Sequence, residues 1–220
     1  MNERGRLRRT RVCSKIGVMR SVLDIGAGPE AITLPPYFAG WKRVRLDVDA
    51  ATNPDLLLDA RELSKQPAGE YDAVYCAHNL EHYHRSDGLR VLNGIRHVLK
   101  PKGFAEFRVP DLGAVFKLIA EKNLDVDDIL YTSGVGPILV RDVIYGYQPY
   151  IENAPNDFYS HKTGFTRKSL HDFFSRVNFE RVVIGTFLPI ELTAFAFVTL
   201  PTPEQAKMLS LPESICAASV

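Results

Sequence analysis

The chain lacks long apolar runs and an excess of charge of one sign. No apolar run reaches the roughly 18 residues that a membrane-spanning helix needs, and the first residues contain no apolar core of the signal-peptide kind. The net charge is only +1, which disfavours a nucleic-acid interface spread over the whole surface. We therefore expect a soluble, cytoplasmic protein without an extensive nucleic-acid interface.

The sequence also lacks a cysteine framework. Its three cysteines, Cys13, Cys76 and Cys216, are far apart, with no C-x-x-C pair and no cluster of histidine and cysteine. This spacing argues against a disulfide framework and against a structural zinc site, and we expect no metal. Cys76 lies in an apolar run and is predicted to be a small buried hydrophobic residue.

Length and composition favour one domain. The chain has 220 residues, of which 45% are hydrophobic, enough for one full core with a modest insertion. We divide it into a basic N-terminal arm (1–20), a main domain (21–200) and a C-terminal tail (201–220) that we expect to be loosely held. The arm is interpreted either as a solvated start or as an RNA-binding segment, and the absence of interleaved aromatic residues favours the first.

Strands and helices alternate along the main domain. Short apolar runs that end in an acid or a turn predict strands at 21–25, 41–49, 56–58, 71–77 and 104–109. Helical periodicity predicts a helix after the glycine loop, stopped at Pro35, one capped by Ser86, and one over 167–177 capped by Thr166. The β-rich stretches 179–187 and 191–200 suit an antiparallel closing pair. The pattern predicts an α/β, doubly wound, Rossmann-like sheet with helices on both faces.

Residues 111–166 break this alternation. The span is too long for a simple connection between a strand and a helix. It contains a helical stretch, a glycine-rich turn at 133–137 and an aromatic segment at 144–150. We interpret it as a lid-like insertion after the fifth strand, over the carboxyl edge of the sheet. A stabilising excursion packed on one flank is the alternative.

The first strand leads into a glycine loop that organises the chain. Asp24 is followed by Gly26 and Gly28, and glycines there allow a tight turn and close approach of a ligand. The third glycine of a dinucleotide fingerprint is missing, and Glu30 in the expected helical turn has the wrong sign beside a pyrophosphate. The loop suits a nucleoside without phosphates, such as S-adenosylmethionine, better than a dinucleotide. An ordinary tight turn is the alternative.

An acid at the end of the second strand is placed to bind a ribose. Asp47 lies about twenty residues beyond the glycine loop, the spacing at which an acid hydrogen-bonds the ribose diol in dinucleotide folds. Asp49 is the reserve candidate. The alternative is a common turn that carries aspartate.

Five short motifs occur together in a telling order and spacing. They are Val22-Leu23-Asp24-Ile25-Gly26-Ala27-Gly28, Arg45-Leu46-Asp47-Val48-Asp49, Leu58-Asp59-Ala60, Asn79-Leu80-Glu81-His82 and Val98-Leu99-Lys100-Pro101-Lys102-Gly103-Phe104. In this combination the chain resembles the class I S-adenosylmethionine-dependent methyltransferases, and within them the small type 11-like group with a Leu-Glu-His signature after the fourth strand. The resemblance runs from Ser21 to about Leu200. It implies a seven-stranded sheet with an antiparallel last strand, and S-adenosylmethionine as the cofactor.

The resemblance also assigns cofactor-binding residues. It implies that the methionine pocket is shaped by the glycine loop, that Asp47 holds the ribose, and that the adenine is lined by the residues after the second and third strands. His78 would sit beside the sulfonium. The implied set is Asp24, Gly26, Ala27, Gly28, Asp47, Val48, Asp59, Ala60 and His78. The departure at Pro29-Glu30 leaves open how the methionine carboxylate is bound.

Three side chains are candidates for catalysis. A general base assists methyl transfer to a hydroxyl or a protonated amine, and Glu81, His82 and His161 are the candidates, with His78 nearby. Each has a simpler interpretation: a cap or arginine partner for Glu81, a helix-start residue for His82, a solvent-facing turn for His161.

We expect transfer of a methyl group to an O or N atom. The fourth strand is not followed by an Asn-Pro-Pro-Tyr-like motif, which favours a small-molecule or glycan acceptor. Three alternatives stay open: a catalytically inactive binding protein of this fold, an RNA methyltransferase, and a nicotinamide-dependent oxidoreductase, which the broken fingerprint disfavours. The sequence leaves the oligomeric state open.

Overall fold

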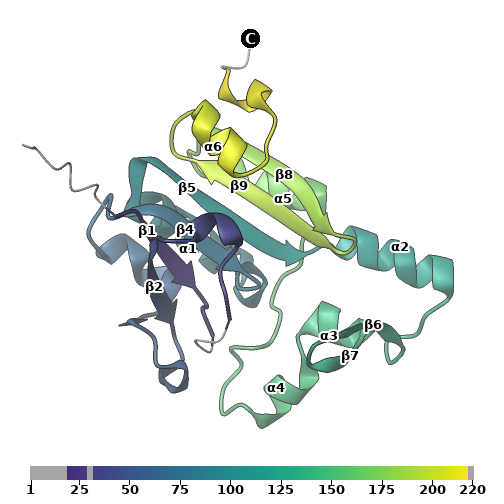
Figure 1. Cartoon of the computed structure of the whole chain (residues 1–220). Coiled ribbons are helices and arrows are strands. Elements are labelled where there is room, and N and C mark those ends of the chain that lie inside the picture. Colours follow the sequence, from purple (N-terminus) through teal and green to yellow (C-terminus); the bar gives the residue numbers. More distant parts are fainter. Residues whose placement is uncertain (1–18, 29–31, 218–220) are drawn as a thin grey trace, which may run out of the picture.

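The computed structural model describes residues 19–28 and 32–217 (Figure 1). Most of the basic arm, the Pro29-Glu30 departure and Cys13 lie outside the described residues. Within them, no helix combines the length and the apolar character needed to cross a membrane.

Seven strands form one sheet in the order β3-β2-β1-β4-β5-β9-β8. The first five strands are parallel to their neighbours, and β9 runs antiparallel to both β5 and β8. The predicted Rossmann-like α/β sheet with an antiparallel last strand is therefore confirmed. The strands are β1 (Ser21–Ile25), β2 (Lys42–Asp47), β3 (Leu56–Leu57), β4 (Tyr71–Ala77), β5 (Leu99–Pro110), β8 (Arg181–Leu188) and β9 (Glu191–Phe197).

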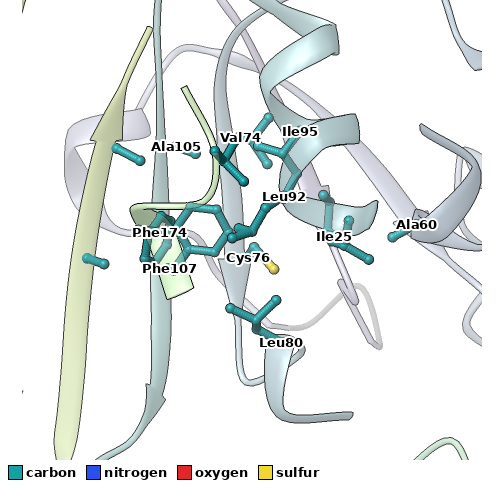
Figure 2. Close-up of a cluster of buried hydrophobic side chains, with 14 of the residues drawn as sticks. Ile25, Ala60, Val74, Cys76, Leu80, Leu92, Ile95, Ala105, Phe107 and Phe174 are labelled. Carbon is teal, nitrogen blue, oxygen red and sulfur yellow. The ribbon is translucent and has the colours of Figure 1, made fainter. Parts of the chain in front are cut away.

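The main core lies on the sheet face covered by α1 (Arg85–Val98) and α5 (Arg167–Phe174). Alternate residues of a strand point to opposite faces, so Val74 and Cys76 of β4 project into this core, as Figure 2 shows. Cys76 is fully buried, as predicted. Thr166 caps α5 by accepting a hydrogen bond from the Ser169 backbone N–H, also as predicted.

The opposite face has a thinner cover. It consists of α6 (Pro203–Met208) and the 3-10 turns η1 (Pro36–Phe38) and η5 (Glu213–Cys216). Ala206, Leu209 and Ile215 are buried there. The expectation of a loosely held tail is wrong for residues 201–217, because this apolar set gives the segment a surface to pack against the sheet.

Two local predictions need correction. Helix α1 begins at Arg85 with His84 in the cap position, so Ser86 lies inside the first turn and does not cap it. Residues 32–35 are irregular, so the predicted helix does not extend into them, and η1 is the first regular element in the part of the chain that is described from residue 32 on. Pro35 and Pro36 cannot lie inside a helix that begins before them, because proline lacks a backbone N–H and its ring clashes with the preceding turn. They can start one, and the 3-10 turn η1 begins at Pro36.

The insertion forms a small subdomain with its own apolar cluster. It contains α2 (Leu112–Lys122), β6 (Ile129–Ser133), β7 (Gly136–Leu139), α3 (Val140–Tyr145) and α4 (Gln148–Asn153). The hairpin and α3 share a buried cluster with α2, and they lie beyond the carboxyl ends of the parallel strands (Figure 1). The chain returns at Lys162 and Thr163, whose backbone N–H groups donate to the Glu81 carbonyl at 2.9 and 3.1 Å.

One ion pair, at the amino ends of the parallel strands, makes the free energy of unfolding depend on pH. Asp72 accepts hydrogen bonds from Lys100 Nζ at 2.7 Å and from the Ser21 backbone N–H at 2.9 Å. Partial burial disfavours the charged carboxylate, but these bonds outweigh it and lower the pKa of Asp72. A pKa below the unfolded value stabilises the fold above that value and loses this effect as the pH falls through the folded pKa.

We therefore expect Asp72→Asn to lower the free energy of unfolding by about 1 kcal/mol at neutral pH. The loss should shrink toward zero at an acidic pH below the lowered pKa of Asp72, where the wild-type carboxylate also gains a proton. Urea unfolding at both pH values measures this, with Glu121→Gln in an exposed helical pair as the control. An equal loss at both pH values would contradict the assignment.

Candidate active site

The glycine loop has a backbone that only glycine adopts easily. Gly26 and Gly28 have φ values of +67° and +57°, in the left-handed region that strains other residues. A Cβ on Gly26 would also collide with the side chain of Asn79. The loop is held to the next strand by the Gly26 N–H, which donates to the Leu46 carbonyl at 2.9 Å.

Asp47 ties the second strand to this loop. Its Oδ2 accepts from the Gly28 N–H at 3.0 Å, and its Oδ1 accepts from the Asp49 N–H at 2.9 Å. Arg45, which the sequence analysis did not single out, donates from Nη2 to the Gly28 and Thr52 carbonyls, each at 2.6 Å. A carboxylate has about four acceptor positions, so Asp47 retains capacity for a diol.

Asp24 lies behind the loop. It is 4% exposed and pairs with Arg43, whose Nη2 and Nε donate to Oδ2 at 2.5 and 2.8 Å. Burial raises the pKa of Asp24, and Arg43 opposes the rise. The side chain therefore faces its arginine partner, while Ala27 is buried beneath the turn.

A cavity of about 260 Å³ opens beside the carboxyl ends of the strands. It brings Val48 and Asp59, both predicted cofactor residues, together with His82, a predicted catalytic residue. The Asp59 carboxylate caps the 3-10 turn η3 (Ala60–Lys65) and pairs with Arg61, and Ala60 is buried below it. The lining residues are Val48, Asp59, Arg61, Asn79, His82, Tyr83, His84, Asp87, Asp157, Phe158 and Lys162.

His78 follows β4 in a left-handed conformation, with φ +48°. Its Nε2 lies 2.9 Å from Glu191 Oε2, and its Nδ1 lies 3.6 Å from Glu81 Oε1. Desolvation disfavours the imidazolium, but the two carboxylates outweigh it and raise the pKa of His78. The residue thus links the end of β4 to the start of β9.

The structure brings all three predicted catalytic residues together. Glu81 and His82 lie in the 3-10 turn η4 (Leu80–His82), and His161 lies at the end of the insertion. One ligand atom from each side chain lies within 4.8 Å of the others, and the two imidazole rings are 4.9 Å apart in a T-shaped arrangement.

The charge states within this group differ. Burial alone would raise the pKa of the Glu81 carboxyl, but the neighbouring histidines, His78 foremost, lower it. Burial lowers the pKa of His161, which favours a neutral imidazole. The group therefore combines an ionised carboxylate with a neutral ring.

Comparison with known proteins shows which domains this fold is similar to. Residues 23–107 match the family model of a methyltransferase domain, a stretch that runs from β1 through β5 and includes the glycine loop, Asp47 and the Leu-Glu-His signature. The predicted class I methyltransferase fold is confirmed. The methyltransferase match and the fold both support S-adenosylmethionine as the cofactor.

Several solved methyltransferase structures share the fold. An S-adenosylmethionine-dependent methyltransferase from Archaeoglobus fulgidus has a TM-score of 0.53 and 13% identity, over 82% of this chain and 86% of that one. One from Methanosarcina mazei has a TM-score of 0.51 and 14% identity, over 84% and 94%. The 1,6-didemethyltoxoflavin-N1-methyltransferase of Burkholderia thailandensis, solved with S-adenosylhomocysteine, has a TM-score of 0.50 and 18% identity, over 82% and 72%. No curated protein matches the sequence significantly.

Several residues of the cavity at the carboxyl ends of the strands were not predicted as site residues. Asn79 was noted only as part of the Leu-Glu-His signature, yet it packs on Gly26 and lines the cavity. Asp157 and Phe158 come from the insertion and gave no local signal, because only the fold brings them to the opening. Lys162, which directly follows the predicted catalytic residue His161, lies on the cavity wall.

Proposed function

We propose that the protein transfers a methyl group from S-adenosylmethionine to an O or N atom of a small-molecule or glycan acceptor. One observation carries the proposal: the cavity at the carboxyl edge joins the predicted adenine residues Val48 and Asp59 with the predicted catalytic residue His82. Ligands of open α/β sheets bind at this edge, next to the glycine loop. The family match over the same strands supports the cofactor.

We assign parts of the cofactor to the predicted residues as follows. The left-handed glycines let the loop approach the methionine portion, and Asp47 accepts the ribose hydroxyls while it holds the Gly28 N–H. Val48, with 40% of its surface exposed, offers an apolar contact for the adenine. Asp59 lies at the adenine edge, and His78 stands at the end of β4 near the sulfonium.

The transfer is an in-line displacement, so the site mainly has to align the acceptor atom, the methyl carbon and the sulfur. The acceptor lone pair forms the new bond to carbon as the carbon–sulfur bond breaks. The electron pair of the broken bond stays on sulfur. A hydroxyl acceptor loses its proton as the new bond forms, whereas an ammonium acceptor must lose its proton first, because only the free amine has a lone pair. Glu81, His82 and His161 form the acceptor-activating group, close to the cavity that takes the cofactor.

The insertion at 111–166 acts as the lid over this site. Asp157 and Phe158 line the cavity, and Tyr159 Oη donates to Asp49 Oδ2 at 3.4 Å across the opening. The acceptor would enter between these residues and η4. Because the insertion contributes both His161 and these lining residues, it is proposed to select the acceptor.

A labelled-methyl assay tests the proposal. The protein is incubated with methyl-labelled S-adenosylmethionine and panels of hydroxyl- and amine-bearing small molecules, glycans and RNA. We expect label in a small-molecule or glycan product. Label in RNA alone would favour the RNA alternative, and cofactor binding without label in any panel would favour a binding protein; either result contradicts the proposed acceptor chemistry.

Asp47→Ala is the matched cofactor variant. We expect it to weaken S-adenosylhomocysteine binding about 10- to 100-fold, since hydrogen bonds to a charged group contribute about 1.5–3 kcal/mol. Asp172→Ala, an exposed change on α5, should leave the affinity unchanged. Calorimetry measures both, and an unaltered affinity in Asp47→Ala would remove the ribose role.

A further inference from the structure

Glu81, His82 and His161 bring three possible metal ligands close together: one carboxylate oxygen and one nitrogen from each imidazole ring. These ligand atoms lie within 4.8 Å of one another. They come from two segments, η4 and the end of the insertion, that the backbone joins through the Glu81 carbonyl. The positions are therefore fixed by the fold and not by chance contact of mobile surface side chains.

Both imidazoles are oriented by the backbone. His82 Nδ1 lies 3.2 Å from the Ser160 carbonyl, and His161 Nδ1 lies 3.0 Å from the Val143 carbonyl. A carbonyl only accepts hydrogen bonds, so each Nδ1 carries the proton when the ring is neutral. The free Nε2 atoms then have lone pairs available for a ligand. Histidines that bind metals are held in this way, with the second ring nitrogen donating to a carbonyl.

The carboxylate has the complementary property. Glu81 is 1% exposed, and neither of its oxygens has a hydrogen-bond partner among the described residues. Its nearest cationic neighbour there, His78 Nδ1, is 3.6 Å away and is shared with Glu191. A buried carboxylate without a hydrogen bond is costly. An ion held by Glu81 and the two imidazoles would give it a close partner, which the more distant and shared His78 does not.

We infer that Glu81, His82 and His161 form a binding site for a divalent transition-metal ion. Two imidazoles and one carboxylate are a ligand set that suits zinc, iron, cobalt and manganese, and three protein ligands leave a coordination position open. Metal bonds of about 2.0–2.2 Å place such ligands about 3–3.5 Å apart, so side-chain shifts of roughly 1 Å complete the geometry. This revises the expectation, drawn from cysteine spacing, that the chain has no metal site.

The open position has a defined neighbour. His82 lines the cavity proposed for the cofactor, so an ion in this site stands next to the reacting methyl group. An acceptor molecule could then bind the ion at this open position through a hydroxyl or carboxylate oxygen. This substrate class rests on the proposed function, whereas the ion itself is bound by residues that need neither cofactor nor acceptor.

The test uses Co²⁺ with untagged full-length protein stripped of metal by a chelator. Visible absorption reports coordination of the ion, and competition with Zn²⁺ and Mn²⁺ ranks the metals. We expect one ion per chain and a rise in melting temperature when Co²⁺ is added. The titration needs no cofactor or acceptor, so its failure is separate from a failure of methyl transfer.

His161→Asn and His82→Asn are the informative variants. An asparagine amide can take the place of Nδ1 and keep the bond to the backbone carbonyl, while the Nε2 ligand is lost. We expect each variant to melt like the metal-free wild type and to bind Co²⁺ at least tenfold more weakly. His171→Asn, at an exposed histidine of α5, is the control and should bind like the wild type.

Glu81→Gln supplies a third, charge-specific readout with the same expected loss. Co²⁺ affinity in His161→Asn equal to that of the wild type would overturn the site. So would an equal loss in His171→Asn, because the ion would then be held by surface histidines in general.

Discussion

Phe107→Ala is expected to lower the free energy of unfolding by about 3–5 kcal/mol, the range for removing a buried aromatic ring. Phe107 lies in the middle of β5 and is fully buried. Its ring contacts Phe174 of α5 edge to face, with centroids 4.9 Å apart and planes at 71° (Figure 2). The cavity would open between the sheet and the helix that covers it, where neither element can collapse inward without breaking its backbone pairing.

Urea unfolding monitored by circular dichroism measures this loss as a shift of the unfolding midpoint to lower urea concentration. Phe116→Ala is the matched control, since Phe116 of α2 is 53% exposed and its removal should change stability by no more than about 0.5 kcal/mol. Similar losses in the two variants would contradict the placement of the core between β5 and α5.

Gly26→Ala is expected to weaken S-adenosylhomocysteine binding about 10- to 100-fold. Left-handed backbone costs a non-glycine residue about 1–2 kcal/mol, and the new Cβ would also collide with Asn79. To relieve the backbone strain and the collision, the loop has to shift from its position beside Asn79. Each 1.4 kcal/mol of binding free energy lost weakens the affinity about tenfold.

Gly40→Ala separates the two causes. Gly40 has φ +79°, and a Cβ there meets nothing within 4 Å among the described residues, so this variant carries backbone strain without a collision. It should be destabilised to a small degree and bind S-adenosylhomocysteine like the wild type. Calorimetric titration measures the S-adenosylhomocysteine affinity of both variants. Wild-type affinity in Gly26→Ala would show that the glycine loop is not part of the cofactor site.

Local sequence patterns were enough for the frame of the sheet. The strand β4 has the predicted bounds, Tyr71–Ala77, because a short apolar run between polar turns leaves little freedom for its ends. Thr166 was recognised as a helix cap because capping depends on residues within one turn. The closing pair β8 and β9 was also predicted, since its alternation and the intervening Pro189 are local.

The site residues required contacts that local patterns do not contain. His82 and the Ser160 carbonyl are 78 positions apart in the chain, so the orientation of the imidazole depends on how the insertion returns to η4. The sequence named Glu81, His82 and His161 separately, as alternative bases. Their convergence on one point, which underlies the metal site, is a property of the tertiary structure.

The prediction of a loosely held C-terminal tail was wrong for a related reason. The burial of residues 201–217 depends on the sheet face that they cover together with η1, and this contact between distant parts of the chain leaves no local pattern in the sequence. Similarly, Ser86 is a good cap by type, but the chain leaves η4 in an extended conformation at His84, which starts the helix before Ser86 is reached.

Calorimetric titration with S-adenosylmethionine, S-adenosylhomocysteine and NAD tests the central claim most directly, because the proposed function requires a sulfonium nucleoside bound by the glycine loop and Asp47. We expect saturable, one-site binding of both sulfur nucleosides in the micromolar range and no binding of NAD. Binding of NAD without either sulfur nucleoside would contradict the account and return the chain to the nicotinamide-dependent class.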